Sequence, residues 1–314
     1  MSLGQDNTTW CHPAGSLSDG PWDCVVDTSL EGWNHTGLRT ATLRGGDVVE
    51  LPLTGVEAVV VPLSGGLRVD VVGDGEVVSF QLAGRTGVFA GPTDVAYAPP
   101  GTTLRLVAPS DLGPEAASRV AVCLATTTTA GASPARHLAA DEVPVELRGA
   151  GIACREVRNF GVPGVLDAQR MIACEVLTPA GNWSSWPPHK HDTERPGVEA
   201  ALEEIYWFET RSTDDRGTDA VGYQRVYGTA ERPIDALAEV RTGDVVLVPH
   251  GWHGPAIAAP DADLYYLNVM AGPGAERTWL ICYDPAHEWV REAWEHQEPD
   301  PRLPFGTQHS RTAP

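Results

Sequence analysis

Hydrophobic and polar positions alternate over short distances along most of this chain. In the first half, Val-rich runs are broken by Gly, Pro and Asp, and they lie at 48–55, 58–73, 76–84, 94–109 and 118–128. The same rhythm returns in the second half, at 171–179, 203–210, 222–228, 238–249 and 263–272. Strands at this spacing, with no helical stretch between them, predict antiparallel sandwiches or barrels.

The two halves also share a local pattern that indicates duplication. RTGVFAGPTDVAYAPPGTTLRLVAP and RTGDVVLVPHGWHGPAIAAP both place an apolar strand and a turn with Pro and Gly after Arg-Thr-Gly. We therefore expect two all-β domains in tandem, 1–135 and 136–314, with an unpatterned linker near 125–144. One amphipathic helix is expected near 285–296, followed by a Pro-rich extended tail that packs on the barrel or on a partner subunit.

Charge and cysteine content narrow the possible partners. The chain has 22 basic and 42 acidic side chains, a formal charge of -20, which repels phosphate backbones and anionic lipid. We expect neither nucleic acid nor membrane as a partner, whereas a small anionic substrate stays compatible because local cations reverse the field inside a pocket. The six cysteines form no CxxC pair, which favours reduced thiols in a cytoplasmic protein.

Candidate metal ligands begin at His189. Alternate side chains of a strand face the same way, so His189 and His191 point to one side and the residue between them to the other. The following segment, LEEIYWFE, supplies a carboxylate. Glu204 would share the inward face with Tyr206, and Glu203 would lie on the opposite face; the reverse assignment of the two glutamates is the alternative.

A third imidazole follows a turn in GDVVLVPHGWHGP. His253 lies just past this turn, whereas His250 lies within it and is expected to be a turn residue. A His-x-His pair alone is more often solvated than ligating, but the full order of His189, His191, Glu204 and His253 matches the cupin metal signature. The long insertion at 192–203 must then form a loop. Three imidazoles and a carboxylate suit a divalent ion such as Zn, Mn, Fe, Ni or Co.

The first half has no matching His-x-His pair. Its segment AVVVPLSGGLRVDV carries apolar residues where ligands would lie. If the halves are duplicates, we expect the amino-terminal domain to be a scaffold, or part of a dimer interface, without a metal.

These segments resemble the 5-deoxy-glucuronate isomerases of myo-inositol catabolism, and more distantly the 5-keto-4-deoxyuronate isomerases. The resemblance is carried by GWNHTGLRTATLRGGDVVEL, GRTGVFAGPTDVAYAPPG, NWSSWPPHKHD, ALEEIYWFE, YQRVYG, VVLVPHGWHGPAIAAPDADLYYLNVMAG and DPAHEWVREAW followed by DPRLP. It implies a bicupin of two double-stranded β-helix (jelly-roll) barrels and a cytosolic isomerase acting on a small anionic sugar acid. It also implies that His189, His191, Glu204 and His253 bind the ion, with Zn or Mn expected first.

The implied reaction converts 5-deoxy-D-glucuronate to 5-dehydro-2-deoxy-D-gluconate by moving a proton between adjacent carbons. A metal acting as Lewis acid would stabilise the cis-enediolate. The candidate proton-transfer groups are Tyr206, Glu203 and Asp192, with a metal-bound hydroxide as the alternative. Core packing is the alternative role of Tyr206. The cationic candidates for the substrate carboxylate, each of which could instead be solvated, are Lys190, Arg195, Arg225 and Arg277.

Two other classes of function stay open at this point. A cupin dioxygenase uses the same kind of ligand set with iron and consumes oxygen. A sugar-binding cupin without catalysis is the second alternative, although an intact ligand set argues against it. We also expect a homo-oligomer, with a dimer as the simplest form.

Overall fold

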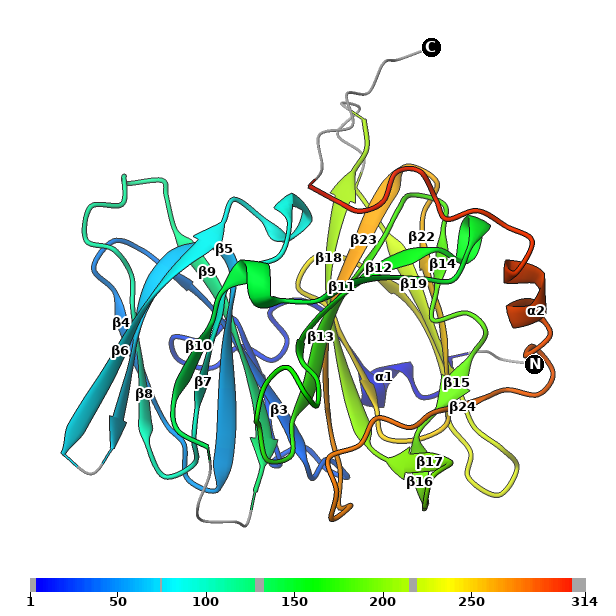
Figure 1. Ribbon diagram of the computed structural model, residues 1–314, viewed down its shortest axis with the longest axis horizontal. Coiled ribbons are helices and arrows are strands. Elements are labelled where there is room, and N and C mark those ends of the chain that lie inside the picture. Colours follow the sequence, from blue (N-terminus) through cyan, green and yellow to red (C-terminus); the bar gives the residue numbers. More distant parts are fainter. Residues whose placement is uncertain (1–3, 74, 128–132, 215–218, 307–314) are drawn as a thin grey trace.

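The computed structural model describes residues 4–306, except 74, 128–132 and 215–218. It contains two β-barrels side by side, one built largely from the first half of the chain and one largely from the second (Figure 1). Almost every element is a strand, and the pairings are antiparallel. The predicted all-β class, with two barrels in tandem, is confirmed.

The amino-terminal barrel is held together by one exceptionally long strand, β5. Its first part pairs with β7 and β9 and its second part with β6 and β8, so a single strand runs through both layers of the barrel. The interior is filled with Val, Leu and Ala side chains. The elements are β2 (Cys24–Val26), β3 (Thr36–Leu43), β4 (Val48–Pro52), β5 (Val56–Gly73), β6 (Glu76–Arg85), η1 (Val88–Ala90), β7 (Val95–Ala98), β8 (Thr103–Val107), β9 (Ser118–Thr126) and β10 (Arg136–Leu138).

The carboxy-terminal barrel has a seven-stranded and a six-stranded sheet, with a separate two-stranded hairpin. Its elements are α1 (Asn7–Trp10), β1 (Cys11–His12), η2 (Ala140–Glu142), β11 (Val145–Arg148), η3 (Gly151–Ala153), β12 (Arg155–Gly161), β13 (Ile172–Thr178), β14 (Trp183–Ser184), β15 (His189–Lys190), β16 (Asp192–Arg195), β17 (Glu199–Ala201), β18 (Glu203–Ser212), β19 (Gly222–Tyr227), β20 (Asp235–Val240), β21 (Val245–Val248), β22 (Trp252–Ala258), β23 (Ala262–Ala271), β24 (Cys282–Tyr283) and α2 (Val290–Trp294).

Strand pairing shows how the two barrels correspond. β5 lies between β7 and β9 as β18 lies between β21 and β23. Glu57 is opposite Ala125 in the first barrel, and Glu203 is opposite Ala271 in the second. The turn after β7 and the turn after β21 both have the form Pro-x-Gly. This matched register supports the duplication inferred from the sequence.

Two buried glutamates join the barrels reciprocally. Glu57 accepts hydrogen bonds from the three consecutive backbone N–H groups of 169–171, at 2.7, 2.7 and 2.8 Å. Glu203 accepts them from the three N–H groups of 34–36, at distances down to 2.6 Å. Each carboxylate therefore fixes the loop that leads into a central strand of the other barrel. We call this pair of contacts the reciprocal glutamate clamp.

An apolar layer fills the space between the clamps. Alternate residues of β5, β9, β18 and β23 point into it, because one face of each strand looks toward the neighbouring barrel. Ile205 and Trp207 enter this layer from β18, whereas Tyr206 and Phe208 belong to the interior of the carboxy-terminal barrel. The predicted alternation of this strand is confirmed.

The division of the chain into two domains at residue 135 stays a prediction. Strand pairing crosses this position in both directions. β1 pairs with β21 of the carboxy-terminal barrel, although it lies near the amino terminus. β10 lies after residue 135 but pairs with β7 of the first barrel. The predicted linker near 125–144 thus contains β10 and η2 as well as residues outside the described part.

The carboxy-terminal helix is shorter than predicted. α2 covers Val290–Trp294, and the preceding residues form successive turns that start at Asp284, whose carboxylate accepts the N–H of Ala286. The tail packs on both barrels, as the N–H of Gly151 bonds to the carbonyl of Glu298 and the Phe305 ring lies 5.9 Å from Phe89. Its last residues, 307–314, lie outside the described part.

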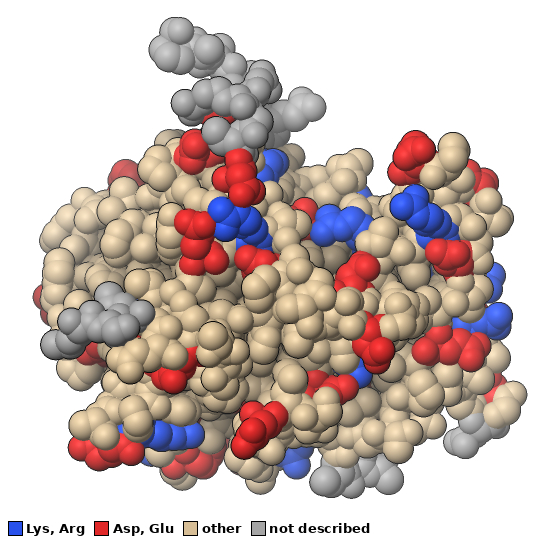
Figure 2. Space-filling model, turned by 180° about the vertical axis from the view of Figure 1, so that it is seen from behind, with Lys and Arg blue, Asp and Glu red and all other residues tan. Residues whose placement is uncertain are grey.

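The surface carries charged side chains of both signs, and the cysteine thiols are free. Acidic side chains are spread over the face seen in Figure 2, with basic ones among them. All six cysteines are free, and four of them are buried. In the described ranges, no helix has the length and apolar character needed to cross a membrane.

The reciprocal glutamate clamp makes a stability prediction. Glu57→Ala would leave three buried N–H groups without an acceptor, at about 1 to 3 kcal/mol each, so we expect the free energy of unfolding to fall by roughly 3 kcal/mol or more. Glu50→Ala, in the same barrel but 62% exposed, should change it by less than about 0.5 kcal/mol. Denaturant titration of both variants measures this. Equal stability of the two would contradict the clamp.

Candidate metal centre

Three strands of the carboxy-terminal barrel bring four side chains together. His189 on β15 lies opposite His253 on β22, with ring centres 4.4 Å apart, and His191 lies 4.7 Å from His253. One nitrogen from each of the three rings lies within 4.8 Å of the others. Glu204 on β18 places Oε2 3.1 Å from Nε2 of both His191 and His253. All four predicted ligands thus meet at one point.

Backbone carbonyls orient two of the rings. Nδ1 of His191 lies 3.1 Å from the carbonyl oxygen of Leu202, and Nδ1 of His253 lies 3.1 Å from that of Gly251. A neutral ring that donates from Nδ1 has a lone pair on Nε2. In that tautomer, two nitrogen lone pairs and a carboxylate oxygen converge on one another.

Converging acceptors need a positive charge between them. Nε2 of His253 is buried and has no hydrogen-bond partner among the described residues. Buried polar atoms without partners are rare in proteins, and a metal ion is one way to satisfy them. The donor set of three imidazole nitrogens and one carboxylate oxygen therefore fits a borderline divalent ion.

Ionisation within the cluster suits the same role. Burial raises the pKa of Glu204, but the neighbouring His191 and His253 outweigh this effect and bring the pKa down to about 2. Burial lowers the pKa of His189, and the neighbouring His253 and His191 lower it further. An ionised carboxylate beside a neutral imidazole is the protonation state that metal binding requires.

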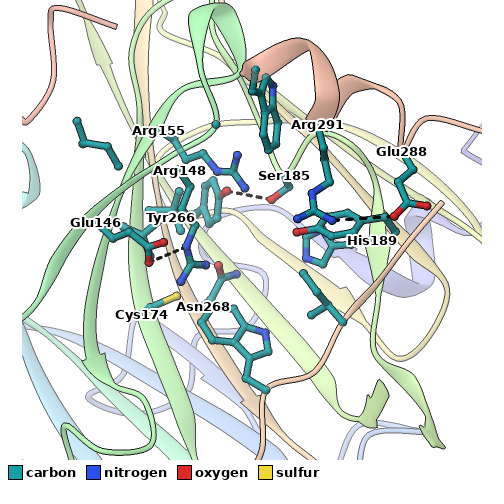
Figure 3. Close-up of a pocket in the computed structure, with 18 of the residues that line it drawn as sticks. Glu146, Arg148, Arg155, Cys174, Ser185, His189, Tyr266, Asn268, Glu288 and Arg291 are labelled. Atoms are coloured by element: carbon teal, nitrogen blue, oxygen red, sulfur yellow. Dashed lines mark hydrogen bonds and ion pairs between the residues drawn. The ribbon is translucent and has the colours of Figure 1, made fainter. Parts of the chain in front are cut away.

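A cavity of about 990 Å³ opens beside the cluster. His189, Glu204 and Tyr206 form part of its wall. His189 is labelled in the view of the cavity in Figure 3. One side is the barrel, through β11, β12, β13, β18 and β23, and the other side is the segment 279–295, which crosses the barrel and includes α2. Its size matches the upper range of small-molecule sites.

The structure places the three predicted proton-transfer residues in three different environments. Tyr206 lines the cavity, and burial followed by the charge of Glu204 raises its pKa well above the usual value. Glu203 points away into the reciprocal glutamate clamp, because the alternation of β18 puts it on the other face. Its predicted part in proton transfer stays a prediction. Asp192 lies outside the cavity, where it binds Lys190 and the N–H of Gly251.

None of the four predicted substrate-binding cations lines the cavity, and each is engaged elsewhere. Lys190 points away between the two histidines and binds Glu199 at 2.6 Å, and Arg195 binds the same carboxylate. These contacts belong to the hairpin β16–β17, which is the predicted insertion between His191 and Glu204. The insertion is thus a hairpin with charged side chains, and its two strands form a separate sheet.

The other two cations have structural roles. Arg225 binds Asp235 across β19 and β20. Arg277 donates to the carbonyl oxygens of Met171, Leu166 and Gly161 at 2.5 to 2.6 Å, and so anchors the segment that crosses the cavity. Both side chains are in use before any substrate arrives. Their predicted role as carboxylate binders is not tested by these contacts, which give both side chains partners within the protein.

The sequence interpretation missed the cations that do line the cavity. These are Arg148 on β11, Arg155 on β12 and Arg291 on α2 (Figure 3). β11 and β12 were not predicted at all, because charged residues alternate with apolar ones there and no Val-rich run marks them. The alternation itself was the usable signal: Arg155 and Val157 face the cavity, while Glu156 and Arg158 face the opposite side.

The amino-terminal barrel has lost these ligands position by position. Ala58 occupies the place of Glu204, as both follow a clamp glutamate on the central strand. Pro52 lies opposite Thr103 as His189 lies opposite His253. At these places the described residues of the first barrel therefore supply no nitrogen or carboxylate donor.

Fold and site together define the class of protein: a two-barrel cupin with a candidate metal centre in its second barrel. The fold is shared with a solved oxalate decarboxylase at a TM-score of 0.60 and 10% identity, over 90% of this chain and 80% of that one. A solved IolB-like protein from Salmonella typhimurium LT2 is more similar, with a TM-score of 0.77 and 32% identity over 90% and 98% of the two chains.

The chain belongs to the KduI/IolB family, whose model matches residues 10–290. Curated relatives are similar over most of their length. The 5-deoxy-glucuronate isomerase of Geobacillus kaustophilus is 38% identical over 83% of this chain and 88% of its own. That of Bacillus subtilis strain 168 is 35% identical over 85% and 92%. The predicted family is confirmed, and the chain is an isomerase.

The centre makes a prediction about metal content. His191→Ala should lose most of the bound divalent ion, because it removes one of four converging donors. His250→Ala is the matched control, since His250 lies three residues from His253 but contacts only the carbonyl of Pro233, at 3.3 Å. Elemental analysis of both purified variants, with circular dichroism to check folding, measures the difference. A full metal complement in folded His191→Ala would refute the centre.

Proposed function

We propose that this isomerase is metal-dependent and converts 5-deoxy-D-glucuronate to 5-dehydro-2-deoxy-D-gluconate, within inositol catabolism in the cytoplasm. The observation that carries the proposal is the meeting of His189, His191, Glu204 and His253 on the wall of a cavity that also contains guanidinium groups. The substrate is assigned by the 5-deoxy-glucuronate isomerases to which the chain is similar. Zn or Mn suits the donor set.

The reaction moves one proton from C2 to C1 and one from the C2 hydroxyl to the aldehyde oxygen. No oxidant or reductant is needed, because the aldehyde is reduced as the neighbouring alcohol is oxidised. A divalent ion held by the four ligands supplies Lewis-acid polarisation of the two substrate oxygens. The rest of the chemistry falls to the side chains of the cavity.

Tyr206 is suited to the oxygens rather than to the C–H bond. Its pKa, raised by burial and by Glu204, keeps the hydroxyl protonated at neutral pH. A protonated phenol donates a hydrogen bond to a developing oxyanion and can pass a proton between neighbouring oxygens. We therefore assign it as the donor to the substrate oxygens, in place of the base considered from the sequence.

The test is turnover followed by proton NMR in D2O. The protein should convert 5-deoxy-D-glucuronate to the ketose acid, with deuterium entering at the carbon that receives the proton. Tyr206→Phe should lower kcat by about 10² to 10⁴-fold with the metal retained. Tyr223→Phe, an exposed tyrosine whose hydroxyl bonds to Glu239, should leave kcat unchanged.

Other outcomes point to other functions. Oxygen consumption with an iron-loaded protein would indicate a dioxygenase, and binding of the sugar acid without turnover would indicate a binding protein. Either result would overturn the proposed isomerisation. A homo-dimer is proposed on the same footing as the substrate, and size-exclusion chromatography with light scattering measures it.

A further inference from the structure

Three guanidinium groups line the cavity, but two of them already have counter-charges. Nε of Arg148 lies 2.9 Å from Oε2 of Glu146, and its guanidinium is 5.0 Å from the Trp279 ring. Arg291 lies 4.0 Å from Glu288 and stacks on Tyr283 at 4.5 Å. Both pairs are drawn in Figure 3. Each of these two cations thus has a carboxylate within 4.0 Å.

Arg155 differs from both. Its guanidinium donates to the carbonyl of Ala153 at 3.3 Å and lies 6.0 Å from the Trp294 ring, and no carboxylate of the described chain comes within 4.0 Å. The side chain is half-buried on β12 and lines the cavity. Arg155 is thus a half-buried arginine on the cavity wall whose positive charge is not paired with a carboxylate of the described residues.

Hydroxyl groups adjoin this arginine. The hydroxyl of Tyr266 lies 3.1 Å from Oγ of Ser185 and 2.9 Å from Oγ of Ser184, and both Tyr266 and Ser185 line the cavity. Figure 3 shows the Arg155 guanidinium beside the Ser185–Tyr266 contact. The charge of Arg155 is also felt at Tyr266, whose pKa it lowers against the larger effect of burial. A guanidinium binds a carboxylate through charge-assisted hydrogen bonds, and Ser and Tyr hydroxyl groups can donate further hydrogen bonds to it.

The cavity that Arg155 lines is also lined by His189 and Glu204 of the candidate metal centre. Arg155 and His189 are both drawn around it in Figure 3. One cavity therefore contains both a guanidinium for an anion and the candidate centre for the reacting oxygens. A sugar acid has both groups on one short chain.

We propose that Arg155 binds the carboxylate of the substrate and so sets the specificity of the cavity for sugar acids over neutral sugars. This assignment rests on the proposed function for the identity of the substrate. Arg155 holds the end of the substrate remote from the reacting carbons. The bidentate geometry of a guanidinium fixes the direction in which the rest of the chain extends.

The test compares a sugar acid with its neutral counterpart. Arg155→Gln should lower kcat/KM for 5-deoxy-D-glucuronate about 10- to 100-fold, mainly through KM, because hydrogen bonds between charged groups are lost. Turnover of 5-deoxy-D-glucose, which has a hydroxymethyl group in place of the carboxylate, should change by less than about 2-fold. Arg155→Lys, which keeps the charge, should recover part of the loss.

Arg225→Gln is the matched control, since Arg225 has a carboxylate partner and lies outside the cavity. We expect the kcat/KM of this variant for both sugars to equal that of the unchanged protein. Equal losses for the charged and the neutral sugar in Arg155→Gln would indicate a structural role and overturn the proposal. Unchanged kcat/KM for 5-deoxy-D-glucuronate in that variant would overturn it as well.

Binding of an inert sugar acid separates this proposal from the proposed function. Calorimetric titration of the metal-loaded protein with D-gluconate requires no turnover, and D-glucitol serves as the neutral probe. We expect gluconate to bind the unchanged protein at least 10-fold more tightly than it binds the Arg155→Gln variant. The affinity for glucitol should be the same in both proteins. If gluconate binding depends on Arg155 but the protein has no isomerase turnover, the proposed function is refuted and the anion site at Arg155 is supported. If gluconate binds equally well to the Arg155→Gln variant, the anion site is refuted.

Discussion

Two consecutive carboxylates on β18 serve opposite sides of one strand, and the rest of the structure depends on this arrangement. Glu203 binds three backbone N–H groups of the amino-terminal barrel, and Glu204 lies between two imidazoles in the carboxy-terminal one. Successive residues of a strand must point to opposite faces, so fixing one of these carboxylates fixes the other. The barrel interface thereby sets the position of a metal ligand. A change in that interface that rotated β18 would move Glu204 out of the cluster.

The amino-terminal barrel contributes to the site only through this interface. Glu57 repeats the clamp of Glu203, but the next residue is Ala58 where the second barrel has Glu204. The two barrels thus share the residue that joins them and differ at the residue that is a candidate metal ligand in the second. A scaffold needs its clamp to keep the partner strand in register, and it needs no ligand. The feature that the two barrels share is the glutamate that joins them, and the feature that differs is the residue after it.

The positions of the candidate ligands could be predicted from the sequence, whereas the partners of the cations could not, for a physical reason. Ligands on a strand follow a period of two and lie next to a recognisable turn, so His189, His191, Glu204 and His253 could be placed by local rules. Whether a cation is free depends on which carboxylates or carbonyls the fold brings to it, and that is a tertiary property. Arg277 meets three carbonyl oxygens from 161–171, and no pattern near residue 277 announces them. Arg155 looked ordinary because its strand carries charges on both faces.

The balance of charge in the cavity connects the metal to substrate binding. Its lining includes five carboxylates, those of Glu146, Glu204, Glu288, Glu292 and Glu295, against three guanidinium groups. With these side chains ionised, the lining has a net negative charge and would repel a sugar acid. A divalent ion among the imidazoles offsets that excess, and the pairing of Arg148 with Glu146 and of Arg291 with Glu288 leaves Arg155 as the cation available to a ligand. A bound ion would therefore have an electrostatic role before any chemistry begins, because it would make an acidic cavity receptive to an anion.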